Sequence, residues 1–302
     1  MPQGIREGLM NKRIKRILST AIPVLVLLVG LSVMLYPIIS EWWNSKVQTR
    51  AVAGYNEAVS QLDKSQTEEI LNQAHDYNNR LNSILRPFTD YEEIDGYEET
   101  LDISGTGIMG YITIPAINSE LVIYHSTSDE VLNIAAGHLQ GTSLPVGGEG
   151  THSVISAHRG LPSAKLFSEL DKLVVGDTFT ITILDEVLTY QVKNIYIVEP
   201  HEIDKLLVVP DKDYLTLMTC TPYGINTHRL LVRSERVETV YKANVNVTAD
   251  AAPVDSMMIV PFLALPPFLG LMLLWSLKGR RKRQRRKQLK RLLRGNTKDG
   301  DS

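Results

Sequence analysis

The sequence predicts a mainly β domain, either a closed barrel or a sandwich, held between two apolar stretches of membrane-spanning length. Short runs rich in Ile, Val, Thr and Tyr recur along the middle of the chain, separated by Gly, Pro, Asn or Asp. No phosphate-binding glycine loop, internal repeat or alternating strand–helix pattern is present. Seven or eight strands at this spacing are typical of barrels and sandwiches. The expected strands are 108–114, 121–124, 152–157, 178–184, 187–198, 214–219 and 228–237, with short helical pieces near 129–136 and 163–170.

A basic segment, 1–16, precedes an uncharged apolar stretch at 17–39. About 23 residues of helix cross a hydrocarbon core of roughly 30 Å, and Trp42 and Trp43 follow where the membrane–water interface is expected. A cleaved signal peptide is the alternative. The apolar run is long for a signal peptide, and no small-x-small cleavage site follows it before Glu41. We therefore predict a retained transmembrane helix after a cytoplasmic N-terminus.

A second uncharged stretch, 257–277, precedes a basic tail at 278–302. Prolines interrupt the stretch, but membrane helices tolerate proline. The tail holds eleven Lys or Arg and no acid within 278–294. By the positive-inside rule, the tail and the N-terminus are cytoplasmic, which leaves residues 40–256 outside the cell membrane. We predict a two-pass membrane protein with an extracellular domain, and a tail that also attracts anionic membrane lipid.

Charge is divided unevenly along the chain. Between residues 17 and 277 there are 15 basic and 31 acidic residues, a net charge of −16 without histidine. A surface this acidic repels the phosphate backbones of DNA and RNA, so we expect no nucleic-acid partner. The basic tail beside a predicted span is explained more simply as a topology signal than as a nucleic-acid arm.

Cys220 is the only cysteine in the chain, so no internal disulfide can form. A lone cysteine in an extracellular domain is a reactive thiol or an intermolecular bridge. The alternative is a buried structural cysteine, which is common in proteins generally. One cysteine and no histidine pair at ligand spacing give no metal cluster, so we expect neither a metal nor another cofactor.

The segments around the β domain differ in pattern. Apolar residues recur at spacings of three and four up to residue 85, which predicts a helical stalk within 40–85. Residues 86–107 are acidic, rich in turn-forming residues, and long for a loop in a compact domain. A linker and a movable cover are both compatible with that loop. The β domain is expected at 108–240 and a linker at 241–256.

Cys220 ends one apolar run, and Arg229 and Arg233 lie in the next, beyond a turn-forming loop. This pattern predicts two strands joined by a loop, with a thiol on one side of the loop and a cation on the other. Nearby positive charge favours the thiolate, which is the nucleophilic form. Cysteine catalysis also needs an acid–base partner. Among the seven histidines, His158 closes a strand-like run directly before a turn, which suits the wall of a cleft.

Three blocks resemble the signature blocks of the sortases, in particular the pilin-polymerising class C: SAHRG around His158, TLMTCTPYG around Cys220 and NTHRLLVR around Arg229. The resemblance implies an eight-stranded sortase-type β-barrel with short helices. It also implies that Cys220 is the nucleophile, His158 the acid–base and Arg229 the cation that holds the oxyanion or the substrate. Arg233 falls on the same strand face as Arg229 and stays an alternative, although an arginine directly after His228 matches the class C pattern.

The reaction that the resemblance implies is transpeptidation at a Gram-positive cell membrane. Cys220 would attack the Thr carbonyl of an LPXTG-like sorting signal on a pilin subunit, and a lysine of another pilin subunit would take over the acyl group as an isopeptide. His158 can protonate the leaving amine and later deprotonate the attacking one. Two other interpretations stay open: a sortase of another class that anchors proteins to the cell wall, and an inactive membrane-anchored assembly scaffold.

Class C sortases often cover the site with a lid in the long loop, through an Asp-Pro-aromatic motif. The matching position here is Arg86-Pro87-Phe88. The aromatic residue is kept, but an Asp that could pair with the catalytic arginine is absent. We therefore expect a lid that is held by the burial of Phe88 rather than by an ion pair.

Overall fold

The computed structural model describes residues 3–239, with side chains from residue 21 onward. The expected linker at 241–256, the second span at 257–277 and the basic tail at 278–302 lie outside the described residues and stay predictions. The chain divides into two compact units, and the larger one, Tyr36–Ala243, holds the β domain and the predicted site.

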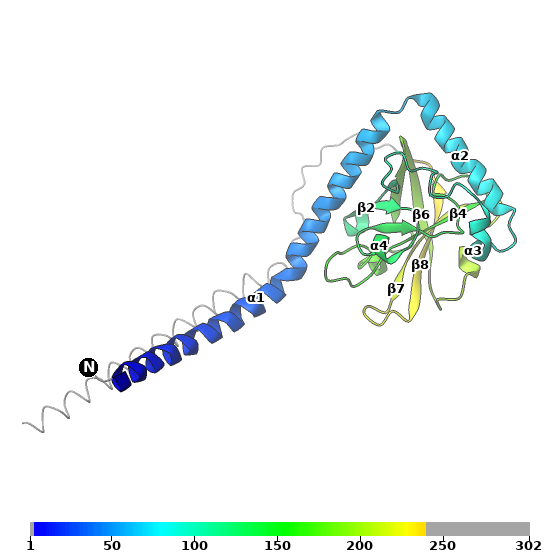
Figure 1. Cartoon of the computed structure of the whole chain (residues 1–302). Helices are drawn as coiled ribbons and strands as arrows, with labels where there is room; N and C mark the ends of the chain where they lie inside the picture. Colours follow the sequence, from blue (N-terminus) through cyan, green and yellow to red (C-terminus); the bar gives the residue numbers. More distant parts are fainter. Residues whose placement is uncertain (1–2, 240–302) are drawn as a thin grey trace, which may run out of the picture. The chain divides into compact units, whose positions relative to one another are not determined.

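Two long helices precede the β domain (Figure 1). The first, α1, spans Gln3–Ser60, and within the described residues only its part Ala21–Ser60 is long and apolar enough to cross a membrane. The expected span at 17–39 falls on this helix, and its role as a membrane anchor stays a prediction. The second helix, α2, spans Lys64–Asn82 and begins with a capping box at Asp63.

Buried polar contacts hold the C-terminal part of α1 against the β domain. The Tyr55 hydroxyl donates to the carbonyl of Met109 at 2.8 Å and accepts from the amide of Leu184 at 2.8 Å. Gln48 is 5% exposed and its side chain bonds to two backbone groups of the β domain. Buried polar groups cost free energy unless they are paired, so these bonds fix where residues 36–60 of α1 lie along the barrel.

The strands form a closed barrel in the order β1-β2-β3-β4-β7-β8-β6-β5, which confirms the expected eight-stranded fold. Every strand expected from the sequence is present. The additional strand is β3, a three-residue segment that is too short to show a period in the sequence. The strands are β1 Ile108–Ile114, β2 Ser119–Tyr124, β3 Ala136–His138, β4 Thr151–Ser156, β5 Thr178–Ile183, β6 Glu186–Val198, β7 Asp213–Thr221 and β8 His228–Val237.

The two expected helical pieces differ from the structure. The piece near 129–136 forms a helix only at its start, because its end is β3. The helix expected near 163–170 is wrong, because the chain forms turns there and Leu166 has a φ of +40°, which an α-helix does not accommodate. The apolar residues of this segment are nevertheless buried in the main core. The short helices are α3 Pro87–Asp90, α4 Asp129–Leu132, η1 Tyr91–Glu93, η2 Pro115–Ile117, η3 Leu170–Lys172 and η4 Asp204–Leu206.

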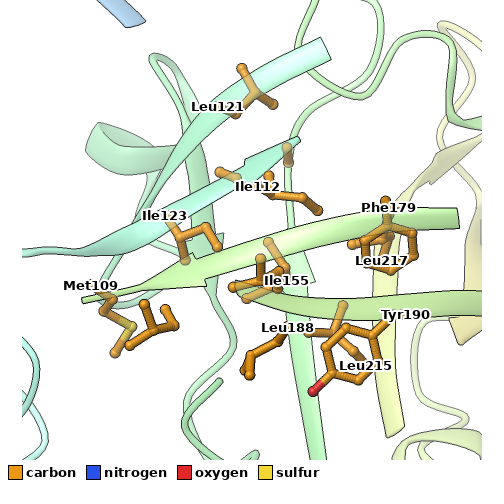
Figure 2. Close-up of a cluster of buried hydrophobic side chains, with 14 of the residues drawn as sticks. Met109, Ile112, Leu121, Ile123, Ile155, Phe179, Leu188, Tyr190, Leu215 and Leu217 are labelled. Atoms are coloured by element: carbon orange, nitrogen blue, oxygen red, sulfur yellow. The ribbon is translucent and has the colours of Figure 1, made fainter. Parts of the chain in front are cut away.

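The barrel wall has an inner face and an outer face that pack differently. Figure 2 shows inner side chains from several strands, including Leu215 and Leu217 of β7, which are fully buried in the main core. Side chains alternate along a strand, so Met218 and Cys220 belong to the outer face. A smaller set of buried side chains, which we call the outer cluster, consists of Val154, Val198, Leu206 and Leu231.

Candidate active site

Neighbouring strands bring the three predicted site residues together at one end of the barrel. Strands β4 and β7 run parallel, with Ser156 paired to Met218. Strands β7 and β8 run antiparallel and pair Cys220 directly with Arg229. His158 lies two residues beyond Ser156, as Cys220 lies two beyond Met218. Because two residues is one strand period, His158 and Cys220 leave the paired strands on the same outer side.

The exposure of the three residues suits a reactive site. Cys220 is a free, half-buried thiol, and His158 and Arg229 are also half-buried. Among the described residues no carboxylate pairs with Arg229, whose Nη1 makes only long contacts to the carbonyls of Asn226 (3.5 Å) and His228 (3.4 Å). Its other N–H groups are thus available to bind an anion beside the thiol.

Arg233, the alternative cation, is engaged elsewhere. Its guanidinium lies between the rings of Tyr196 and Tyr214, 5.2 Å and 4.9 Å from the two centroids. It donates to the Tyr196 hydroxyl at 2.8 Å and to Asn194 at 3.2 Å. On β7 it pairs with Thr216, four residues before Cys220. Arg229 is therefore the arginine that the strand register sets opposite the thiol.

Two buried histidines are unsuited to proton transfer. Burial lowers the pKa of His138 and of His152 to about 4, so both rings are neutral at pH 7. The ring nitrogens of His152 bond to the carbonyl of Leu207 at 3.0 Å and to the Thr216 hydroxyl at 2.8 Å. The His158 ring, in contrast, has no hydrogen-bond partner among the described residues.

The expected lid residues lie on the outer face of the barrel. Phe88 packs against the outer cluster together with Met218, two residues before Cys220. Arg86 bonds within its own segment, its Nε donating to Asp90 Oδ2 at 3.1 Å. A Cβ added to Gly141 would come within 2.5 Å of the Pro87 carbonyl oxygen, so the backbone of α3 rests directly on that glycine. A cavity of about 250 Å³ lies beside this contact.

Sequence reasoning missed two residues that shape the site. Gly141, at a φ of +80°, permits the close approach of α3, and its presence in a glycine-rich loop was the only sequence signal for it. Thr219 precedes Cys220 and donates its hydroxyl to the carbonyl of Ala157 at 2.8 Å. That bond ties the residue before the thiol to the residue before His158.

Comparisons with known proteins agree with this fold. A sortase-domain family model matches residues 112–237. Sortase C1 of Streptococcus agalactiae is 47% identical with a TM-score of 0.58, over 63% of this chain and 100% of that one. Sortase C of Streptococcus pneumoniae is 47% identical with a TM-score of 0.56, over 63% of this chain and 97% of that one. Sortase C-1 of Actinomyces oris is 44% identical with a TM-score of 0.52, over 57% and 99% of the two chains.

Curated relatives are more distant and match over a shorter region. Sortase A of Streptococcus agalactiae is 30% identical over 135 residues, which is 44% of this chain and 54% of the length of that protein. The similarity to the class C structures, by contrast, extends over 97–100% of those chains. The chain therefore belongs to the sortase family, and its structural relatives are class C sortases.

Proposed function

We propose that this protein is a class C sortase, a cysteine transpeptidase that cleaves an LPXTG-like sorting signal of pilin subunits and joins them to a pilin lysine. The observation that carries the proposal is the direct pairing of Cys220 with Arg229, next to the strand that leads to His158. The Streptococcus pneumoniae relative is described in terms of pilin substrate specificity, and 47% identity to it supports the same substrate class here.

The first half of the proposed reaction forms a thioester. The Cys220 thiolate attacks the Thr carbonyl of the sorting signal, and the carbonyl oxygen becomes an oxyanion beside the free N–H groups of Arg229. The C–N bond to the following Gly then breaks. Protonated His158 gives its proton to the leaving amine, which departs with the Gly side of the substrate.

The second half transfers the acyl group to the acceptor. A lysine amine attacks the thioester carbonyl, neutral His158 takes the proton from the attacking nitrogen, and the C–S bond breaks to release the thiolate. One peptide bond is thereby exchanged for one isopeptide bond, and the enzyme returns to its starting protonation state. No step requires a metal or another cofactor.

The segment from Arg86 to Phe88 serves as a lid in this proposal. Phe88 packs on the same outer cluster as Met218 of β7, so an extended substrate bound along the outer face of β7 would displace it in this proposal. Pro87 and Phe88 pack on the Gly141 backbone, while Arg86 pairs with Asp90 inside the segment. These contacts support a lid held by packing, without an ion pair to Arg229.

The proposed location is the outer surface of a Gram-positive cell membrane, with the catalytic domain extracellular. The apolar part of α1 is the anchor in this proposal, and 257–277 is a second span that returns the basic tail to the cytoplasm. The tail would add contacts to anionic membrane lipid. Protease treatment of intact cells tests this topology, because it should remove the β domain and leave an epitope at either terminus protected.

The reaction is tested with the full-length protein in detergent, a peptide carrying an LPXTG-like signal, and two competing acceptors. The expected product with a lysine-bearing pilin fragment is an isopeptide, identified by tandem mass spectrometry, and Cys220→Ala should abolish it. Exclusive transfer to a peptidoglycan amine would instead assign the protein to a cell-wall-anchoring class. Absence of both products, with Cys220 intact and reactive, would support an inactive scaffold.

A further inference from the structure

The residue after His158 makes an unusual set of contacts. Arg159 is 9% exposed, and its Nη2 donates to Asp171 Oδ2 at 2.5 Å. Its Nη1 lies 3.4 Å from the hydroxyl of Thr221, the residue after Cys220. Its guanidinium also lies over the ring of Tyr223, 5.7 Å from the centroid. One largely buried cation on the His158 loop thus contacts the Cys220 strand at Thr221 and the 167–171 segment at Asp171.

Together with Thr219, Arg159 ties the two strand ends on both sides of the candidate pair. Before the pair, the Thr219 hydroxyl bonds to the carbonyl of Ala157. After the pair, Arg159 reaches Thr221. The chain positions of the thiol and the imidazole are therefore enclosed between two side-chain bridges, beyond the last backbone pairing of β4 with β7.

The backbone next to Arg159 is shaped for this contact. Gly160 has a φ of +82°, and a Cβ there would come within 3.2 Å of the Tyr223 ring. The Gly160 amide donates to the Ser168 hydroxyl at 3.1 Å, and the carbonyl of His158 accepts from the amide of Phe167 at 3.2 Å. The loop that carries His158 is thus packed between the Cys220 loop on one side and the 167–171 segment on the other.

We propose that Arg159 is a positioning residue, which holds the His158 loop in place against the Cys220 strand so that the imidazole stays within proton-transfer reach of the reacting atoms. This inference rests on the proposed transpeptidase function. Asp171 neutralises the Arg159 charge, so Arg159 acts through geometry and leaves the oxyanion to Arg229. Misplacing a catalytic group by about 1 Å costs on the order of 100-fold in rate. Removal of the bridge therefore lowers the rate of the chemical step.

The side-chain type matters in this arrangement. The planar guanidinium stacks on Tyr223 while its fork reaches Asp171 and Thr221, three contacts that a lysine ammonium cannot make together. A lysine at position 159 can keep the ion pair with Asp171 but loses the stacked contact. The substitution Arg159→Lys therefore distinguishes the effect of the positive charge, which it keeps, from that of the planar guanidinium, which it removes.

The test measures kcat and KM for transfer from a sorting peptide to a lysine peptide, together with thermal unfolding, in the full-length protein. We expect Arg159→Ala to lower kcat about 10–100-fold with KM within about twofold of wild type. Arg159→Lys should recover part of that loss. A second variant, Tyr223→Leu, removes the stacking ring from an exposed loop and should lower kcat in the same direction, which covers the case in which Arg159→Ala does not fold.

Arg80 provides a matched control. It also makes an ion pair, with Asp76 at 3.0 Å, and lies over a tyrosine ring, that of Tyr77 at 5.8 Å, but it is on α2 away from the site. Arg80→Ala should leave kcat unchanged. An Arg159→Ala protein with wild-type kcat, or one that loses kcat only in proportion to its folded fraction, overturns the inference alone. If the wild-type protein shows neither transfer nor an acyl adduct on Cys220, the proposed function is overturned as well.

Discussion

The inner and outer faces of strands β7 and β8 share one backbone and differ in packing. On the inner face, Leu215, Leu217 and Val232 are fully buried in the barrel core. On the outer face, Cys220 and Arg229 are half-buried and lie opposite each other. The packed core on the inner face holds the backbone of both strands, and this backbone sets the positions of the reactive groups on the outer face. Substitutions on the two faces should therefore separate stability from chemistry.

The largest effect is expected on the outer face, where two arginines can be compared. Arg229→Ala should lower kcat about 100–1000-fold, as does the loss of an oxyanion donor in other enzymes. Arg233→Ala, its matched control on the same strand face, should lower kcat by less than about tenfold and mainly reduce the unfolding temperature, because it loses two aromatic contacts. Steady-state transfer kinetics distinguish the two. An equal loss of kcat in both variants would contradict the assignment of Arg229.

The next effect contrasts adjacent residues on opposite faces. Leu217→Ala should lower the free energy of unfolding by about 2–5 kcal/mol, since it leaves a cavity in the core. Met218→Ala should cost clearly less, because Met218 is half-buried on the outer face. Urea denaturation of both variants measures the difference. If Met218→Ala lowers the free energy of unfolding more than Leu217→Ala does, the inner face is not the main source of stability and this interpretation is wrong.

The sequence predicts the inner face better than the outer one. Seven strands follow from β-branched runs bounded by turn residues, and the strand–loop–strand pattern around Cys220 already sets a thiol near Arg229. The neighbourhood of His158 depends on a parallel pairing of β4 with β7, which joins segments about 60 residues apart and leaves no local pattern. The position of His158 at a strand exit indicated the wall of a cleft, but only the family resemblance put His158 and Cys220 in one site.

Errors in the prediction also have physical causes. A helix is expected near 163–170, but the chain forms turns there, and its apolar side chains are buried in the barrel core from those turns. The contact of Pro87 and Phe88 with Gly141 depends on how closely two backbones approach, and a single glycine in a loop does not reveal its neighbour. Likewise, the contacts of Arg159 become visible only once the loops after β4 and β7 are placed side by side.

The third prediction concerns the pH dependence of stability, which two buried histidines should dominate. The pKa values of buried His138 and His152 are lowered from 6.5 to about 4, so the unfolded chain binds protons between these values that the folded chain does not. Stability should therefore be fully present above about pH 6.5 and fall as the pH drops toward 4. Urea midpoints measured between pH 4 and 7.5 test this. A midpoint that rises on acidification would contradict the prediction.

The smallest effect is expected at the lid. Phe88→Ala should raise the rate at which iodoacetamide labels Cys220 by about 3–10-fold, because partial burial of this ring against the outer cluster stabilises the closed segment by roughly 1 kcal/mol. Gly141→Ala should act in the same direction by displacing the α3 backbone. Leu85→Ala is the matched control, since Leu85 directly precedes this segment and is 94% exposed. Equal labelling rates in all variants would show that Phe88 does not cover Cys220.

The most direct test of the central claim is the intact mass of the full-length protein after incubation with an LPXTG-like peptide and no acceptor. We predict a thioester adduct on wild-type Cys220, with the mass of the peptide up to its Thr, that hydroxylamine removes. The adduct should form more slowly in His158→Ala and Arg229→Ala and be absent in Cys220→Ala. An adduct that persists in Cys220→Ala, or none on either wild type or Phe88→Ala, would contradict the claim that this thiol is the nucleophile.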